Sequence, residues 1–144
     1  MRQCRCTPDT IARYQGRLSG PLLDRIDLQV EVPAVPPEQL AAASDGERSD
    51  IVAERVLRAR ERALTRQGFA NARLESTALD EHARLDAATS RFAQGAAVRL
   101  GWSARAFHRM LRVARTVADL GAADAIGTPH VAEAMQYRRV LAVA

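Results

Sequence analysis

The sequence predicts an all-α fold: a small bundle of about four main helices, preceded by an N-terminal segment with little regular structure. Only 4% of the 144 residues are aromatic while alanine is abundant, a composition that favours closely packed helices over a β-sandwich or barrel. From about Glu47 onward, apolar residues recur with the period of a helix. We therefore divide the chain into residues 1–45 and a helical domain of residues 46–144.

The first 45 residues have the pattern of a segment severed from another domain. Residues 26–32 alternate strictly between apolar and polar side chains, as in a β-strand, yet no second strand follows to pair with them. A lone strand cannot satisfy its own backbone hydrogen bonds. The proline-rich residues 33–37 then end regular structure, and residues 41–46 have the composition of a linker. We expect this segment to hold an orphan strand and to be disordered in isolation.

Two helices are predicted in the first half of the helical domain. A long helix begins near residue 47 and ends at Gly68, because glycine is the usual residue after a helix C-terminus. Its apolar stripe consists of Ile51, Val52, Val56, Ala59 and Ala63. A short helix is expected near residues 80–85.

Three further helices follow in the pattern. Residues 87–100 form one, with Phe92, Ala96 and Leu100 recurring every four residues and Gly101 ending it. Ser103 caps the next helix, which Gly121 closes. The apolar face of that helix consists of Phe107, Met110, Leu111, Ala114, Val117 and Ala118. The last helix has Thr128 as its N-cap and Pro129 at its first position, and runs to about residue 140.

All 21 basic residues are arginine, and this bias limits the functions that the chain can perform alone. A GC-rich genome explains the overall excess of arginine but not the place of each one. Without lysine the chain cannot contain a P-loop, which needs a lysine ammonium on the phosphates. The net charge of +4 permits nucleic-acid binding but does not establish it.

The sequence holds no apolar stretch typical of a membrane span or of a signal peptide. We therefore expect a cytoplasmic protein with no membrane partner.

Two motif segments, one at residues 17–28 and one within residues 103–120, carry a family resemblance. The segment RLSGPLLDRIDL at residues 17–28, together with SAR at 103–105 and VARTVADL at 113–120, resembles the ComM/YifB proteins, which are magnesium-chelatase-like AAA+ ATPases. The resemblance runs from Cys4 to about Leu141. It implies an AAA+ lid-type helical domain at residues 46–144, and at residues 1–45 the end of an α/β ATPase core whose Walker motifs lie outside this sequence.

The resemblance also implies a function for the full-length protein. Such a protein is a homo-hexameric ring that binds ATP and Mg²⁺ and hydrolyses ATP, with ComM acting in DNA branch migration. This chain would contribute nucleotide sensing and ring contacts, and its partners would be the missing AAA+ core, neighbouring subunits and DNA. Alone, the chain is expected to hydrolyse no ATP and to hold no cofactor.

Two arginines match functional positions of the family. Arg25, in the LLDRID motif, matches the arginine finger that acts on the nucleotide of a neighbouring subunit; the alternative is that it pairs with Asp24 or Asp27 on a solvated surface. Arg105 matches the sensor-2 arginine, in the first turn of the helix capped by Ser103, where the helix dipole favours phosphate. Whether Arg105 acts in cis or in trans stays open.

Other polar residues are given structural interpretations. Arg109 and Arg112 lie on the same predicted face as Arg105, and a solvated surface is the expected role for both. Cys4 and Cys6 form half of a zinc site that further cysteines of the full-length protein would have to complete; two reduced thiols are the favoured alternative. The three histidines lie too far apart in sequence for a chelating motif, and none is assigned to catalysis.

Two other functions remain open. The chain could belong to a magnesium chelatase ATPase subunit that drives Mg²⁺ insertion into a porphyrin, although the two motif segments fit ComM better. It could also be a stand-alone basic helical module that binds nucleic acid. Its arginines are spread over several helices without an aromatic-basic platform, which argues against specific base readout.

Overall fold

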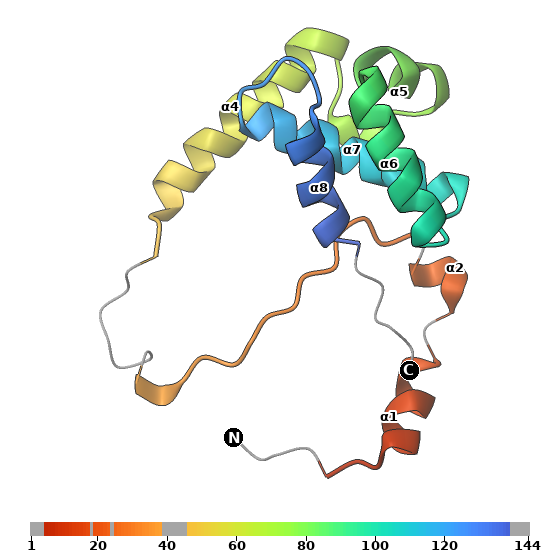
Figure 1. Cartoon of the computed structure of the whole chain (residues 1–144). Helices are drawn as coiled ribbons and strands as arrows, with labels where there is room; N and C mark the ends of the chain where they lie inside the picture. The colour runs from red at the N-terminus through yellow and green to blue at the C-terminus, as the bar shows by residue number, and fades with distance from the viewer. Residues whose placement is uncertain (1–4, 18, 24, 39–45, 139–144) are drawn as a thin grey trace.

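The computed structural model describes residues 5–17, 19–23, 25–38 and 46–138, and most of its helices pack around a central one (Figure 1). In chain order the elements are α1 (Pro8–Gln15), α2 (Gly20–Leu23), α4 (Ser49–Gln67), the 3-10 helix η1 (Asn71–Arg73), α5 (Ser76–His82), α6 (Ala87–Arg99), α7 (Ala104–Leu120) and α8 (Thr128–Gln136). The described part contains no β-sheet, only an isolated bridge between Leu85 and Ile126. The predicted all-α class is confirmed.

Helix α7 is the centre of the bundle. Its residues Met110, Ala114 and Ala118 follow one another every four positions and are completely buried. Because two of the three are alanines, neighbouring helices can approach closely, and α4, α5, η1 and α8 all pack against α7. Trp102, just before the helix, is partly buried and packs against the same core.

Helix α4 confirms the predicted long helix but packs over only part of its length. It ends at Gly68, whose φ of 79° is the left-handed conformation that glycine adopts without strain. Ala59 and Ala63 are buried, whereas Ile51 and Val56 at the other end of the predicted stripe are exposed. The first half of α4 projects beyond the bundle, away from the other described helices (Figure 1).

Helix α6 has the predicted bounds within one residue, but the predicted buried face is only partly correct. Ala96 is buried as predicted, whereas Phe92 and Leu100 are exposed, and the face that packs is formed by Thr89, Ala93 and Ala96. These small side chains lie towards α8, where they allow close contact between the two helices.

Two other predicted boundaries need correction. The short helix near residues 80–85 is α5, which begins and ends earlier, at Ser76 and His82. The N-cap of α8 is Gly127 rather than Thr128, and the Nδ1 atom of His130 accepts a hydrogen bond from the Gly127 amide at 3.0 Å. The helix ends at Gln136; the predicted extension to residue 140 runs into positions outside the described residues.

The described residues of the N-terminal segment include the short helices α1 and α2 and an extended stretch. Thr7 caps α1 by accepting a hydrogen bond from the Thr10 amide. Residues 26–32 are in no sheet of the described part of the chain, but they pass below α8 before leaving the bundle (Figure 1). The boundary at residue 45 stays a prediction, because residues 39–45 lie outside the described part.

Across the described residues, none of the helices is both long enough and apolar enough to span a lipid bilayer.

Candidate functional site

The structure brings Arg25 and Arg105 together in an open hollow beside the first turns of α7. The hollow has a volume of about 630 Å³. Its lining consists of Arg25, Glu75, Arg105, His108, Arg109 and Arg112. Arg25 comes from the turn after α2, and Glu75 comes from the residue before α5. Two residues singled out by family motifs far apart in the sequence therefore face one space.

The local sequence of α7 explains why four polar residues reach the hollow. The side chain of Ser103 accepts a hydrogen bond from the Ala106 amide at 3.2 Å, which confirms the predicted cap and begins the helix there. Ala106, Met110 and Ala114 are buried in the core, so the opposite face of α7 projects away from it. That face carries Arg105, His108, Arg109 and Arg112. Arg105 lies in the first turn, where unpaired backbone N–H groups and the helix dipole attract anions.

The guanidinium groups of Arg25 and Arg105 have no hydrogen-bond or ion-pair partner among the described residues. The alternative in which Arg25 pairs with Asp27 is wrong, because the Asp27 carboxylate is bound by Arg109; Asp24 lies outside the described residues. Two unpaired cations in one hollow form a site suited to an anion with several oxygen atoms.

Arg109 and Arg112 are not the solvated side chains that the sequence predicted. One nitrogen of Arg109, Nη1, donates to the carbonyl oxygen of Arg25 at 2.8 Å and to the Asp27 carboxylate at 2.6 Å. The Nε atom of Arg112 donates to the Leu74 carbonyl at 2.6 Å and so holds the chain ahead of α5. Both arginines are partly buried because they bind chain segments far from α7 in sequence.

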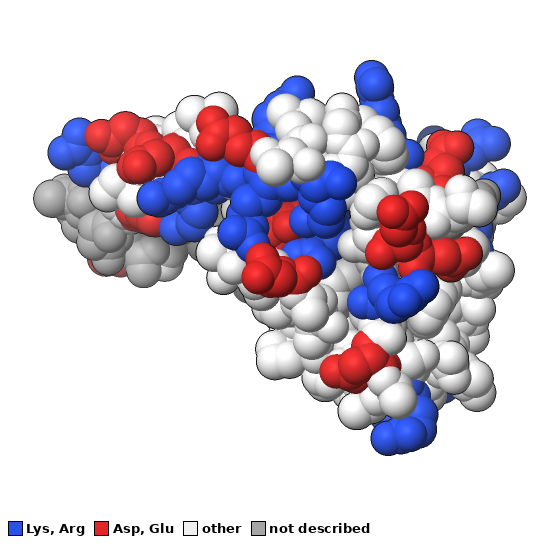
Figure 2. Space-filling view, turned by 90° about the horizontal axis from the view of Figure 1, so that it is seen from above, with Lys and Arg blue, Asp and Glu red and all other residues white. Residues whose placement is uncertain are grey.

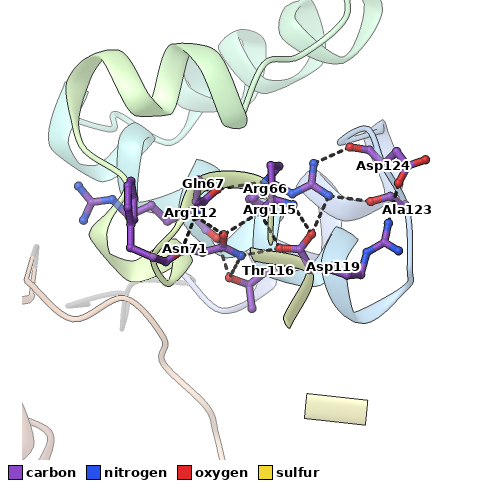
Figure 3. A network of polar contacts seen from close by, with 11 residues as sticks. Arg66, Gln67, Asn71, Arg112, Arg115, Thr116, Asp119, Ala123 and Asp124 are labelled. Carbon is purple, nitrogen blue, oxygen red and sulfur yellow. Dashed lines mark hydrogen bonds and ion pairs between the residues drawn. The ribbon is translucent and has the colours of Figure 1, made fainter. Parts of the chain in front are cut away.

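A second polar cluster lies at the other end of α7 (Figure 3). The Asp119 carboxylate accepts hydrogen bonds from Arg66 at 2.6 and 2.9 Å, from Asn71 at 2.7 Å and from Arg115 at 3.1 Å. Arg115 also donates to the carbonyl oxygens of Ala123 and Asp124 in the loop before α8. The cluster therefore joins α4, η1, α7 and that loop.

Burial and charge act against each other in this cluster. Burial opposes the ionised form of Asp119, but the hydrogen bonds from Arg66 and Asn71 and the charges of Arg115 and Arg66 outweigh it, so the pKa of Asp119 lies below its ordinary value. Burial lowers the pKa of Arg115, and the Asp119 charge partly offsets this effect. Arginine stays charged nonetheless, because its ordinary pKa is so high.

The sequence did not predict this cluster, although two of its residues, Arg115 and Asp119, belong to the VARTVADL motif. Arg115 and Asp119 are four residues apart, immediately after Ala114 and Ala118 of the buried stripe. Oppositely charged residues at this spacing, beside buried alanines, were the available signal for a buried ion pair. Arg115 and Asp119 of this motif therefore have a structural role, because they join α7 to neighbouring elements.

A second hollow, of about 880 Å³, lies between α4 and the loop after α7. Basic and acidic side chains alternate around it (Figure 2). Its arginines are all paired with carboxylates: Arg55 with Glu47, Arg58 with Glu54, Arg62 with Asp124 and Arg66 with Asp119. Their charges are largely neutralised, so this larger hollow is less suited to an anion than the one lined by Arg25 and Arg105.

The described residues hold no group of three or more His, Cys, Asp or Glu side chains able to bind a metal ion. Cys6 is exposed, and Cys4 lies outside the described part of the chain. The half zinc site therefore stays a prediction for a longer protein.

Comparison with known proteins gives two family matches. Residues 46–138 match the model described as magnesium chelatase, subunit ChlI C-terminal, and residues 1–40 match magnesium chelatase, subunit ChlI. The uncharacterized protein YifB of Salmonella typhimurium is 46% identical over 137 residues, which cover 94% of this chain and 27% of that protein. Competence protein ComM of Haemophilus influenzae is 44% identical over 138 residues, which cover 95% of this chain and 27% of that protein.

More distant relatives include an uncharacterized protein of Mycobacterium tuberculosis, 38% identical over 142 residues. The chain spans little more than a quarter of the length of these curated relatives.

Proposed function

The chain belongs to the magnesium chelatase ChlI family, in which it is similar to the ComM and YifB proteins, and on this premise we propose that it senses the phosphates of ATP held by an AAA+ core. Arg25 acts as the arginine finger and Arg105 as the sensor-2 arginine. The observation that carries this proposal is that both guanidinium groups line one hollow and have no partner among the described residues.

The chemistry of the hollow fits this role. Hydrolysis of ATP shifts negative charge during transfer of the terminal phosphate, and a guanidinium placed there stabilises that charge. The lining is rich in cations and offers one carboxylate, Glu75, so it suits phosphate oxygens and not a metal ion. The Mg²⁺ that accompanies ATP would thus be held by the core.

The hollow that Arg25 and Arg105 share also indicates whether Arg105 contacts the nucleotide of its own subunit or that of the neighbouring subunit. A finger acts on the nucleotide of the neighbouring subunit. Since Arg105 lines the same hollow as Arg25, we propose that Arg105 also acts in trans, on the same phosphates. The chain thereby contributes to a nucleotide site between subunits of a ring, for which a hexamer is the proposed form.

For the substrate of the ring we propose DNA, in branch migration, and not a porphyrin. This rests on the similarity to a protein named for competence, which covers 95% of the chain. A stand-alone nucleic-acid-binding role is disfavoured because the arginines beside the larger hollow are already paired with carboxylates. Stimulation of the ATPase of the longer protein by branched DNA, and not by a porphyrin, is the expected result.

Titration of the chain with inorganic tripolyphosphate tests phosphate sensing directly. Isothermal titration calorimetry at low ionic strength should show that Arg25→Gln and Arg105→Gln each weaken binding about tenfold, because each removes a charge-assisted hydrogen bond. Arg58→Gln removes the same charge from an exposed position outside the hollow and is the matched control. Equal losses in all three variants would refute the proposal, since they would reflect net charge alone.

The finger assignment is tested in a longer protein that joins this chain to its AAA+ core. There Arg25→Ala should lower ATP hydrolysis by about a thousandfold or more while ATP binding is largely retained. Normal turnover in that variant would remove the assignment.

A further inference from the structure

The extended segment that carries Arg25 is held against the helical domain from two sides. From α7, Arg109 donates to the Arg25 carbonyl and to the Asp27 carboxylate. From the end of α8, the Tyr137 carbonyl accepts a hydrogen bond from the Gln29 amide at 2.7 Å. Arg138 adds a contact of 3.3 Å to the Ile26 carbonyl. Residues 25–29 are therefore tied to α7 and α8 by both main-chain and side-chain hydrogen bonds.

The side chain of Arg25 contributes nothing to this attachment. Its guanidinium has no partner in the described part of the chain, so its position depends on the main chain that carries it. Arg109 binds the main-chain carbonyl of Arg25 on one side of Ile26 and the side-chain carboxylate of Asp27 on the other. The Arg109 side chain is 19% exposed and the Asp27 side chain 44%, so water screens this ion pair less than it screens a fully exposed pair.

We infer that the Asp27–Arg109 ion pair is a latch that positions Arg25 beside Arg105, so that the finger moves with the helical domain. Asp27 and Arg109 are positioning residues in this inference, which rests on the proposed phosphate-sensing function. When the latch is closed, the two unpaired guanidiniums face one hollow. When it is open, Arg25 loses its fixed place and Arg109 loses its counter-ion.

A positioning role for Asp27 and a purely electrostatic role predict opposite effects of Asp27→Asn on the affinity for tripolyphosphate. Asp27 is an anion close to a basic hollow, so its charge by itself should repel phosphate, and Asp27→Asn should then strengthen tripolyphosphate binding. If Asp27 instead positions Arg25, the same substitution should weaken binding. Glu75 lines the same hollow and forms no ion pair with another described residue, so Glu75→Gln provides the matched loss of one negative charge.

Tripolyphosphate titrations of these variants decide between the two. We expect Asp27→Asn to weaken binding about fivefold, Asp27→Glu to retain most of the affinity, and Glu75→Gln to strengthen binding. In the Asp27→Asn background, a further Arg25→Gln substitution should change the affinity little, because Arg25 is already displaced. Stronger binding by Asp27→Asn, equal to that of Glu75→Gln, would overturn the latch.

Amide hydrogen exchange examines the latch without phosphate. In Asp27→Asn the Gln29 amide should exchange faster than in the wild type, while the amides in the middle of α7 keep their protection and so report an intact fold. Unchanged Gln29 exchange would overturn the latch. If the wild-type chain binds no tripolyphosphate, the proposed function fails, and the exchange result still decides the latch.

Discussion

Arg66 of α4 donates two hydrogen bonds to the carboxylate of Asp119 in α7, at 2.6 and 2.9 Å, and the carboxylate that receives them is almost completely buried. Planar bidentate contacts of this kind are among the strongest polar contacts in proteins. Through Asn71 and Arg115 the same carboxylate reaches η1 and the loop before α8. The long helix α4 is therefore fixed to the bundle by charge as well as by its two buried alanines.

Removal of the Asp119 carboxylate should destabilise the fold strongly. Asp119→Ala leaves Arg115, whose side chain is 3% exposed, as a buried charge without its counter-ion. We expect a loss of about 3–5 kcal/mol in the free energy of unfolding, measured by urea denaturation. Asp124→Ala is the control, because Asp124 is a fully exposed partner of Arg62 and its loss should cost less than about 1 kcal/mol. Similar losses in both variants would contradict the central place of Asp119.

The stability of the chain should depend on pH through Asp119. Its folded-state pKa lies below its unfolded value, so between the two values the unfolded chain binds more protons and stability rises with pH. The contribution is complete above the ordinary aspartate value of about 3.9 and is lost as the pH falls through the lower folded value.

Urea titrations of the wild type and Asp119→Asn measure this dependence. The difference in unfolding free energy between the two should be constant near neutral pH and shrink below about pH 4. A difference that does not change down to about pH 2 would show that the carboxylate gains nothing from ionisation in the folded state.

The buried face of the bundle can be tested with two large apolar residues. Met110 is completely buried, and Met110→Ala should cost about 2–5 kcal/mol because it leaves a cavity at the centre of α7. Phe92, which the helical period placed in the core, is 39% exposed, and Phe92→Ala should cost about 1 kcal/mol or less. Thermal or urea unfolding that ranks the two variants in the reverse order would contradict the observed packing of α6.

Two residues in the left-handed conformation should respond to substitution in opposite directions. Gly68 ends α4 with a φ of 79°, and Ala122 follows α7 with a φ of 54°. Gly68→Ala should destabilise the chain by about 1 kcal/mol, since a Cβ atom is disfavoured there even with open space around it. Ala122→Gly relieves the same strain and should stabilise it by up to about 1 kcal/mol. Changes in melting temperature of the same sign would contradict this assignment.

The sequence predicted the features of the fold that depend on near neighbours. The ends of α4 and α6 and the start of α7 were found because Gly68, Gly101 and Ser103 act within one turn of a helix. The buried face of α6 was not fully predicted from the sequence. Phe92 and Ala93 lie on different sides of this helix, and the position of α8 determines which of the two side chains is buried.

The two arginines of the candidate site could be predicted from the sequence, but their common location could not. Family motifs singled out Arg25 and Arg105 separately, and nothing local in the sequence indicates that they line one hollow. The sequence predicts a solvated side chain for Arg109 because its partner, Asp27, lies 82 residues away in the chain. Contacts over such distances depend on the tertiary fold, which helical periodicity does not contain.

The most direct test of the account is NMR observation of the arginine side chains during titration with tripolyphosphate. We expect the Nε–Hε signals of Arg25 and Arg105 to shift along a single saturation curve, because both guanidiniums bind the same anion, while the signal of the ion-paired Arg58 stays in place. Different midpoints for Arg25 and Arg105, or no shift at either, would contradict the claim that they share one phosphate site.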